Sequence, residues 1–510
     1  MKVLFIISDT LYTEPLGVLY LSAMLKQNGH ETKLAIIANG NLEEIIREFQ
    51  PRVVAYSTMT SHEYLFEEAD EQVKKSAQLL GLDIFRVMGG PHPTYFPKVL
   101  DRLGLDAICL GDGDFALPTI ISRLENNSEL NDIPNVMTPR YRQFNKEVIQ
   151  HITQLPHPDR KILYETAPHL LEVGIRSFLT MKGCPYKCTY CFNHAYNRMF
   201  KGQGRKLLRR RKVSDIIDEI NNVANQFPTL RLVRFADDVF IIQKDEWLEE
   251  FCDRYPREVN IPFYCLYRAN SLTEEIAQML SSSGCVSMSM SIEAGSEYLR
   301  NKVLKRNMSD ELMVESFRIA RKYKLNAYAN TILGIPGTNL EDDWYSYKFS
   351  KKLKAAAPTF GIFSPYPGTE LTDYAVELGQ LDIDYDFNGL TASGKTILSG
   401  YTEKEKDTMR NLQSLGSLFC YLPNFFDPLL KLLIKLPLGR IYGPLGATFV
   451  SAMLAIRCFP GAYPRSLRSI LQSIHRAVRF FNEPSEKKEM RERLKNIAQT
   501  PTVGRSGPDY

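Results

Sequence analysis

The sequence predicts an α/β protein in three parts: an N-terminal doubly wound parallel sheet, a partial parallel β/α barrel and a helical C-terminal region. Two observations predict the sheets, because short apolar runs alternate with helical patterns over the first 135 residues and again after Cys191. The third observation is that strand patterns stop after residue 395. A chain of 510 residues allows about three domains. We expect these domains at 1–135, 169–395 and 396–510, with a linker over 136–168.

The composition is that of an ordinary globular protein, with 44% hydrophobic and 24% charged residues. It excludes a disordered chain and a small disulfide-stapled scaffold, since nine cysteines are sparse in so long a chain. The apolar run at residues 3–7 is too short for a signal peptide, and no uninterrupted apolar run of about 18 residues predicts a conventional transmembrane helix. We therefore expect a cytoplasmic protein, in which clustered cysteines bind metal or do chemistry.

The first domain is expected to begin with a buried strand and to alternate from there. The expected strands are 2–8, 32–37, 53–57, 84–89 and 107–110, and the expected helices are 16–28, 42–49 and 64–80. Ligands on such sheets bind beyond the carboxyl ends of the strands, where the strand order reverses.

Polar residues and glycines follow four of these strands, or open the helix after them, and could contact a ligand. Glycine lets the backbone approach a ligand closely, although the same glycines could simply make tight turns. The absence of a G-x-G-x-x-G pattern argues against a nicotinamide site. The candidates are Asp9, Thr10, Gly17, Ser57, Thr58, Gly89, Gly90, Gly111, Asp112 and Gly113.

The strongest local pattern is the loop that holds Cys184, Cys188 and Cys191. Its C-x-x-x-C-x-x-C spacing lets one loop wrap a corner of a cubane iron–sulfur cluster, which normally takes four thiolates. Three ligands without a near fourth would leave one iron open. The alternative is a zinc knuckle, for which His194 is the neighbouring candidate, although zinc sites more often show paired C-x-x-C motifs.

Apolar, strand-like runs recur after the cysteine loop and are separated by helical patterns. This alternation predicts a partial parallel β/α barrel, whose site lies at the carboxyl ends of its strands. The expected strands are 230–235, 263–267, 286–292, 326–333 and 359–363, with helices at 213–224 and 309–322.

Several motifs in order along the chain carry a resemblance to one family. They are the cysteine loop, Arg234-Phe235-Ala236-Asp237-Asp238-Val239-Phe240, Ser289-Met290-Ser291-Ile292-Glu293-Ala294-Gly295-Ser296, Thr331-Ile332-Leu333-Gly334-Ile335-Pro336-Gly337-Thr338 and Pro365-Tyr366-Pro367-Gly368-Thr369-Glu370-Leu371. Over residues 1–390 the chain resembles the radical S-adenosylmethionine (radical SAM) enzymes. Its first domain resembles the Rossmann-like cobalamin-binding domain that some of these enzymes carry.

The resemblance implies roles for individual residues. A [4Fe-4S] cluster would be held by the three cysteines, and cobalamin by the ten strand-end candidates given above. The carboxylates of Asp237 and Asp238 could receive the ammonium of S-adenosylmethionine, and Glu293 its ribose hydroxyls; each of these acids could instead cap a strand end. The residues implied to contact S-adenosylmethionine are Phe235, Asp237, Asp238, Arg268, Glu293 and Gly334.

One cobalamin pattern is missing from the first domain. Asp9-Thr10-Leu11-Tyr12 lacks the histidine that D-x-H-x-x-G gives to the cobalt, as many enzymes of this class do. His92 lies in a strand-end loop, where a histidine is more often structural than a ligand.

The resemblance also implies the reaction. The cluster passes one electron to S-adenosylmethionine, the resulting 5′-deoxyadenosyl radical removes a hydrogen from an unactivated carbon, and methylcobalamin supplies a methyl group. We expect a C-methyltransferase with a small or lipid-like substrate and a reducing donor such as flavodoxin or ferredoxin. One alternative is a cyclisation, rearrangement or oxidation by the same architecture. The other is a non-catalytic iron–sulfur carrier or sensor.

The C-terminal region combines aliphatic stretches with basic residues. Helices are expected at 403–416 and 466–481, the stretch 422–460 is rich in apolar residues, and 485–510 is expected to be partly disordered. Between 421 and 480 eight basic residues accompany one acid, Asp427, which suits a lipid-contacting surface or peripheral membrane contact. The alternative is a helical cap over the barrel. The basic run at 205–212 reads as a solvated linker, and we expect no nucleic-acid partner.

Overall fold

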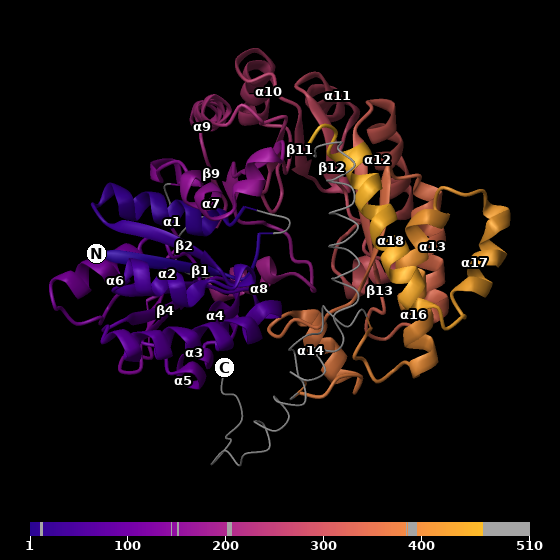
Figure 1. Cartoon of the computed structure of the whole chain (residues 1–510). Helices are drawn as coiled ribbons and strands as arrows, with labels where there is room; N and C mark the ends of the chain where they lie inside the picture. The colour runs from indigo at the N-terminus through magenta and orange to yellow at the C-terminus, as the bar shows by residue number, and fades with distance from the viewer. Residues whose placement is uncertain are drawn as a thin grey trace.

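The computed structural model describes residues 1–10, 14–143, 145–149, 152–200, 207–383, 385 and 395–462. Figure 1 shows the N-terminal domain and the second sheet as separate bodies of strands and helices, with the C-terminal helices at the far side of the second sheet. The helix expected at 466–481 and the tail expected at 485–510 lie outside the described residues.

The N-terminal sheet has the order β2-β1-β3-β4-β5-β6, parallel except for β6. The strand order reverses between β1 and β3, because β2 and β3 lie on opposite sides of β1. The strands are β1 (Lys2–Ile7), β2 (Glu31–Ile36), β3 (Val53–Ser57), β4 (Phe85–Gly89), β5 (Ala107–Cys109) and β6 (Val136–Met137).

Both faces of this sheet are covered, which confirms the predicted doubly wound fold. Val3, Phe5 and Ile7 of β1 join one apolar core, and Leu4 and Ile6 join the other. Burial on both faces explains why β1 is continuously apolar. The first core is covered by α1 (Leu16–Gln27), α6 (Ala116–Glu125) and α7 (Arg160–Thr166), and the second by α2 (Leu42–Phe49), α3 (Glu63–Leu80) and α5 (Val99–Leu103).

The second sheet is fully parallel, with the order β14-β13-β12-β11-β10-β7. Each strand pairs with the next strand of this sheet along the chain, and helices lie between them, so the prediction of a partial β/α barrel is confirmed. The strands are β7 (Ile175–Phe178), β10 (Leu232–Phe235), β11 (Phe263–Leu266), β12 (Cys285–Ser289), β13 (Asn326–Leu333) and β14 (Ala357–Ile362). The helices are α9 (Val213–Gln226), α10 (Glu246–Glu258), α11 (Glu274–Ser282), α12 (Asp310–Lys322) and α13 (Leu340–Leu353). The sequence did not predict β7, nor the small hairpin of β8 (Met181–Lys182) and β9 (Arg209–Arg210).

The C-terminal helices cover the open side of this sheet. They are α16 (Glu403–Phe419), α17 (Asp427–Leu433) and α18 (Gly439–Met453), followed by a π-helical turn (Leu454–Cys458). The turn contacts β12, where the Ser287 hydroxyl donates to the Cys458 carbonyl. The chain then reaches the residue before β7, because the N–H of Gly174 donates to the Ala462 carbonyl. The apolar chain after α18 therefore shields a sheet face that an open barrel would leave exposed.

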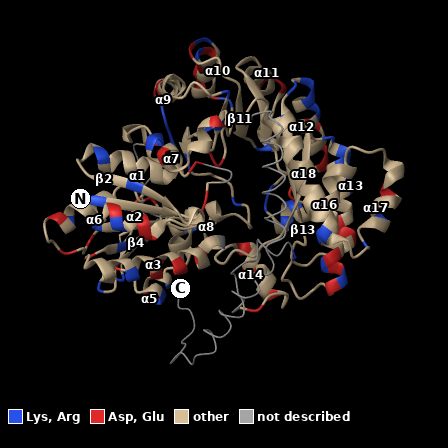
Figure 2. Cartoon of the chain, viewed as in Figure 1, with Lys and Arg blue, Asp and Glu red and all other residues tan. Residues whose placement is uncertain are grey.

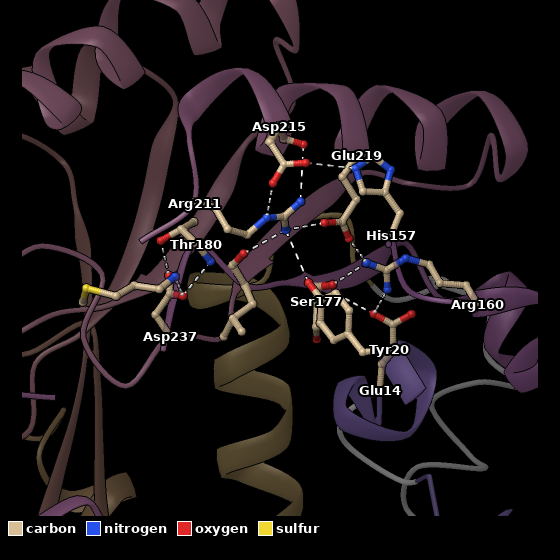
Figure 3. A network of polar contacts seen from close by, with 12 residues as sticks. Glu14, Tyr20, His157, Arg160, Ser177, Thr180, Arg211, Asp215, Glu219 and Asp237 are labelled. Carbon is tan, nitrogen blue, oxygen red and sulfur yellow. Dashed lines mark hydrogen bonds and ion pairs between the residues drawn. The ribbon is translucent and has the colours of Figure 1, made fainter. Parts of the chain in front are cut away.

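A buried chain of ion pairs joins the two sheets (Figure 3). Arg160 of α7 lies 3.0 Å from Glu14, which precedes α1, and 2.9 Å from Glu219 of α9. Glu219 also accepts from Arg211 at 2.5 Å, and Glu14 accepts from the backbone N–H of Ser177 in β7 at 2.5 Å. Breaking a buried pair leaves a charge without compensation, so this network holds the N-terminal domain against the barrel.

Candidate functional site: the facing carboxyl ends of the two sheets

The three cysteine thiols gather in the loop between β8 and α8 (Phe192–Met199). None forms a disulfide, and the thiols of Cys184 and Cys191 both interact with that of Cys188. Burial raises the pKa of Cys184 to about 11 and that of Cys191 to about 12, while backbone N–H groups of Tyr186 and Asn193 donate to their sulfurs and act in the opposite sense. Thiols in this environment ionise when a metal binds them, and N–H donors to the sulfurs are the contacts that a cluster's thiolates use.

Glycine is required at the start of this loop. Gly183 has a φ of 95°, and a Cβ atom there would lie 2.2 Å from the carbonyl oxygen of Leu207. Only glycine allows this approach between the loop and the strand β9 that follows it.

Asp237, which was predicted to receive the ammonium of S-adenosylmethionine, instead supports the cysteine loop (Figure 3). Its Oδ1 accepts from the backbone N–H groups of Thr180 and Met181, both at 2.7 Å, and its Oδ2 accepts from the Thr180 hydroxyl at 2.8 Å. Its relative exposure is 0%. The direct contact is corrected to a supporting one, because no surface of this carboxylate is left for a ligand.

The neighbouring Asp238 is accessible. It interacts with Cys184 and Cys191 and accepts bonds from the Asn193 side chain and the Gly183 backbone. Surrounding protein nevertheless desolvates it and raises its pKa above the usual range. An accessible carboxylate beside the thiols keeps the predicted position for an ammonium, and that contact stays a prediction.

Glu293 joins the cysteine loop to the end of β12. Its Oε1 accepts from the Tyr190 hydroxyl at 3.0 Å and lies 3.3 Å from Nη1 of Arg306. Its backbone has a φ of 65°, which is uncommon for a residue other than glycine and marks a strained position of the kind found at functional sites. No described donor reaches Oε2, so this oxygen is available for the predicted ribose contact.

Arg268 and Phe235 have different surroundings. Nη1 of Arg268 lies 3.2 Å from Sγ of Cys188, and the guanidinium lies over the Tyr186 ring at 3.9 Å. Arg268 therefore contacts the cysteine loop directly.

The Phe235 side chain is fully buried between the sheet and its outer helices and stacks on Phe240 at 4.8 Å. The predicted ligand contact by this side chain is therefore wrong, because the alternation of β10 turns it to the opposite face.

Gly334, at the end of β13, lies against the C-terminal region. A Cβ atom there would lie 2.9 Å from Sδ of Met409 in α16. Its N–H donates to Oδ1 of Asp343 at 2.8 Å, and Oδ2 of Asp343 is buried without a partner. Burial raises the pKa of Asp343 to about 7. The adenine-side strand end is thus covered by α16, and contact with S-adenosylmethionine at Gly334 remains a prediction.

The carboxyl edge of the N-terminal sheet holds buried polar atoms that have no hydrogen-bond partner. They are Oγ1 of Thr58, Oγ1 of Thr60 and both ring nitrogens of His92. Nε2 of His92 lies 3.2 Å from Oε1 of Glu63, but the pair does not have hydrogen-bond geometry. Burial lowers the pKa of His92 to about 4, so the ring is neutral. Such orphaned groups need an explanation, and a polar cofactor at this edge supplies one.

The other predicted residues at this edge divide into two groups. Asp9 lies 3.9 Å from His62, Thr10 is buried and Gly17 is open to space, so these remain candidates, as does Ser57 beside Gly89. Gly90 serves the fold, because a Cβ atom there would lie 2.9 Å from the Thr58 carbonyl oxygen.

Residues after β5 contact the barrel rather than face a free edge. A Cβ atom at Gly111 would lie 2.6 Å from the ring of Phe200, just after α8. Asp112 pairs with Arg209 at 2.6 Å, and Asp114, close to Gly113, pairs with Lys182 at 2.8 Å. Burial acts to raise the pKa of Asp112, but Lys182 and Arg209 outweigh it and hold that pKa below its usual range. We therefore reassign Gly111 and Asp112 from cofactor contact to domain docking.

This docking brings the two carboxyl edges together. Tyr95 follows β4 in α4 (Pro91–Tyr95), stacks on Phe192 at 4.3 Å and donates its hydroxyl to the Phe192 carbonyl at 3.0 Å. Phe192 directly follows Cys191, and Tyr95 interacts with both Cys191 and Asp238. A ligand at the first sheet's edge would thus lie next to the cysteine loop.

The zinc alternative loses its neighbouring candidate for a fourth ligand, His194. Nε2 of His194 lies 2.9 Å from Oε1 of Glu370, so this histidine is already engaged away from the thiols. Among the described residues, no three His, Cys, Asp or Glu side chains converge as the ligands of one metal ion would. The cysteine loop fits a larger group such as a cubane cluster better.

Comparison with protein families agrees with this two-part site. Residues 3–121 match the B12 binding domain, and residues 178–349 match the radical SAM superfamily. The chain belongs to the cobalamin-dependent radical SAM enzymes. The cofactors predicted from the sequence, a [4Fe-4S] cluster, S-adenosylmethionine and cobalamin, are those of this family. Membership also sets aside the non-catalytic carrier.

Several named proteins have sequences similar to that of this radical SAM enzyme. An uncharacterised methyltransferase of Pyrococcus horikoshii is 25% identical over 71% of this chain and 78% of its own length. Cytidylyl-2-hydroxyethylphosphonate methyltransferase of Streptomyces wedmorensis is 23% identical over 72% of this chain and 79% of its own. Anaerobic magnesium-protoporphyrin IX monomethyl ester cyclase of Cereibacter sphaeroides is 22% identical over 70% of this chain and 59% of its own.

A solved structure has the same fold. The cobalamin-dependent S-adenosylmethionine radical enzyme OxsB, solved with aqua-cobalamin bound, superposes with a TM-score of 0.63 at 15% identity. The alignment covers 97% of this chain and 81% of OxsB. The shared fold therefore includes the described C-terminal helices α16 to α18.

Three residues of the radical SAM site were not predicted from the sequence. Tyr190 lies between the second and third cysteines, so its position alone could have marked it. No local sequence pattern marks Arg306 or Tyr95, because each meets the cysteine loop only in the folded protein. Arg306 comes from a loop after β12 and Tyr95 from the other domain.

Proposed function

We propose that this enzyme is a C-methyltransferase that acts on an unactivated carbon of a small or lipid-like substrate. The observation that carries the proposal is the contact of Tyr95 with Phe192, which places the cobalamin domain's strand ends beside the cysteine loop. A methyl transfer from a corrinoid to a carbon radical requires the two cofactor sites to share one space. Two of the three relatives named above are methyltransferases.

The chain's own residues hold and orient the reactants. Cys184, Cys188 and Cys191 would hold the cluster, whose chemistry when bound is to split S-adenosylmethionine reductively. Asp238 and Glu293 would hold the ammonium and ribose of S-adenosylmethionine. Met409 of α16 lies at the strand end of Gly334 and shields that side from water.

The overall reaction balances with two molecules of S-adenosylmethionine. One supplies the methyl group and leaves as S-adenosylhomocysteine. The other is reduced by one electron, takes the substrate hydrogen and leaves as methionine and 5′-deoxyadenosine. The methyl group leaves its sulfonium as a cation equivalent, so its bond to the substrate radical requires a second electron. Both electrons would come from a cytoplasmic donor such as flavodoxin or ferredoxin.

The test is the product pattern after anaerobic reconstitution with iron, sulfide and cobalamin. With S-adenosylmethionine carrying a deuterated methyl group and a strong reductant, we expect both S-adenosylhomocysteine and 5′-deoxyadenosine, and a substrate product that carries the label. Formation of 5′-deoxyadenosine without any S-adenosylhomocysteine would contradict methyl transfer.

That contrary result would favour the second candidate, a cyclisation by the same architecture. The observation behind it is the similarity to the magnesium-protoporphyrin cyclase. A cyclase product would lack the deuterated methyl group.

A second test concerns the binding of S-adenosylmethionine. Replacing Glu293 with Ala removes a carboxylate from a largely buried position, and a hydrogen bond to a charged group is worth about 1.5–3 kcal/mol. We expect affinity for S-adenosylmethionine to fall by about tenfold or more, measured by equilibrium dialysis. An unchanged affinity would remove Glu293 from the site.

A further inference from the structure

The C-terminal helices expose a set of large apolar side chains. Phe425 and Ile456 are 73% and 74% exposed, and Leu432 and Ile441 are 60% and 61% exposed. Figure 2 shows α18 almost without charge. We call this set the C-terminal apolar face, and it consists of Phe425, Leu429, Leu432, Leu438, Ile441, Leu445 and Ile456.

The spacing of these residues places them on one side of each helix. Phe425, Leu429 and Leu432 follow one another at intervals of four and three, and Ile441 and Leu445 at an interval of four. Gly446 lies on the packed side of α18, where a Cβ atom would lie 2.2 Å from the Ser414 carbonyl oxygen of α16. Because α18 is locked against α16 on that side, the apolar face cannot turn inward.

The charges around this face are positive. Lys435, Arg440 and Arg457 are exposed, and none pairs with a described acidic side chain. The single acid between residues 421 and 462, Asp427, is buried and pairs with Lys348 and with Lys351 at 2.5 Å. Aliphatic side chains bordered by unpaired cations suit a bilayer surface that contains anionic lipid.

We infer that the C-terminal apolar face docks on the surface of an anionic membrane. By length and composition alone, the helical stretch Gly439–Cys458 could cross a bilayer, although no uninterrupted apolar run predicts it. Its packing on α16 and the crossing of Cys458 to β12 hold it on the protein, so it lies along the surface. A second copy of the chain fits less well, because its own Lys435, Arg440 and Arg457 would meet like charges. The inference adds a partner to the enzyme and is independent of the proposed reaction.

Vesicle co-sedimentation of the full chain tests this inference. We expect binding to vesicles of phosphatidylcholine with phosphatidylglycerol, and much weaker binding to phosphatidylcholine alone. The double substitution Leu432→Glu with Ile441→Glu should weaken binding at least about tenfold, because it places charge where acyl chains would lie. Leu79→Glu on α3 is the matched control, since Leu79 is 84% exposed in the other domain, and it should bind as the parent does.

The cations have their own variant. Replacing Lys435, Arg440 and Arg457 with Ala should lower affinity for the anionic vesicles by about fivefold for each charge removed. All of these positions are exposed, so circular dichroism should show unchanged folding. The inference is overturned if the parent binds neither vesicle, if the glutamate variant binds as well as the Leu79→Glu control, or if light scattering shows a dimer that the glutamate variant abolishes. None of these outcomes bears on methyl transfer, which is read from products.

Discussion

The Tyr95 hydroxyl donates a hydrogen bond to the carbonyl of Phe192, across the boundary between the cobalamin domain and the radical SAM barrel. The bond is 3.0 Å long, and the two rings stack at 4.3 Å. Because Phe192 follows the last cysteine, the first domain directly contacts the segment that carries the cluster ligands.

Replacing Tyr95 should loosen the start of α8. Tyr95→Phe removes the hydrogen bond and keeps the ring stack, which should cost about 1 kcal/mol and speed amide exchange near Phe192 by about fivefold. Tyr95→Ala removes both and should have a larger effect. Hydrogen exchange read by mass spectrometry measures both variants. Equal exchange in the two would show that the ring stack contributes nothing.

The ion pairs of Arg160 with Glu14 and Glu219 should be essential for the stability of the fold. Arg160→Leu leaves Glu14 and Glu219 buried without their partner, and breaking a buried pair costs about 3–5 kcal/mol. Arg254→Ala is the matched control, because Arg254 pairs with Glu258 at 2.7 Å on an exposed helix face and should change little. Chemical denaturation measures the free energy of unfolding of both variants. Equal losses would contradict a stabilising role for the ion pairs of Arg160.

The two neighbouring aspartates should have separable roles. Asp237→Asn swaps an acceptor oxygen for a donor in a site that already holds three donors, so the cysteine loop should bind less iron. Asp238→Asn keeps one oxygen that can accept from the Gly183 backbone, so the variant should retain iron while it loses the charge that binds S-adenosylmethionine. Iron analysis with equilibrium dialysis separates them. Full iron in Asp237→Asn would contradict the supporting role.

The contribution of Asp343 to stability should be lost as the pH rises toward neutrality. Burial raises the pKa of Asp343 to about 7 from an ordinary value of 3.8. Between these values the unfolded chain has released its proton and the folded chain has kept it, so raising the pH favours unfolding. Asp343→Asn should flatten this decline, and urea unfolding at about pH 5 and about pH 7 measures it. An equally steep decline in the variant would show that Asp343 does not titrate there. Asp237, whose pKa burial also raises to about 7, contributes to the remaining slope in the same direction, and His92, whose pKa burial lowers to about 4, contributes in the opposite direction.

The sequence predicted what local patterns determine. Alternating apolar runs predicted both sheets, and the cysteine spacing predicted the metal loop. The pattern could not reveal that Glu14 pairs with Arg160 across 146 residues, nor that Asp112 meets Arg209. An acid at a strand end looks the same whether it meets a ligand or the other domain, so Asp112 and Asp237 were misassigned. Strand β7 went unrecognised because Arg176 and Ser177 interrupt its apolar pattern.

The most direct test of the central claim is cleavage of S-adenosylmethionine by anaerobically reconstituted protein with and without Cys188. The parent should hold iron and sulfide, bind cobalamin and release 5′-deoxyadenosine under reduction. Cys188→Ala should bind cobalamin and release none. A parent that holds only zinc, or a Cys188→Ala variant that cleaves as the parent does, would contradict the account.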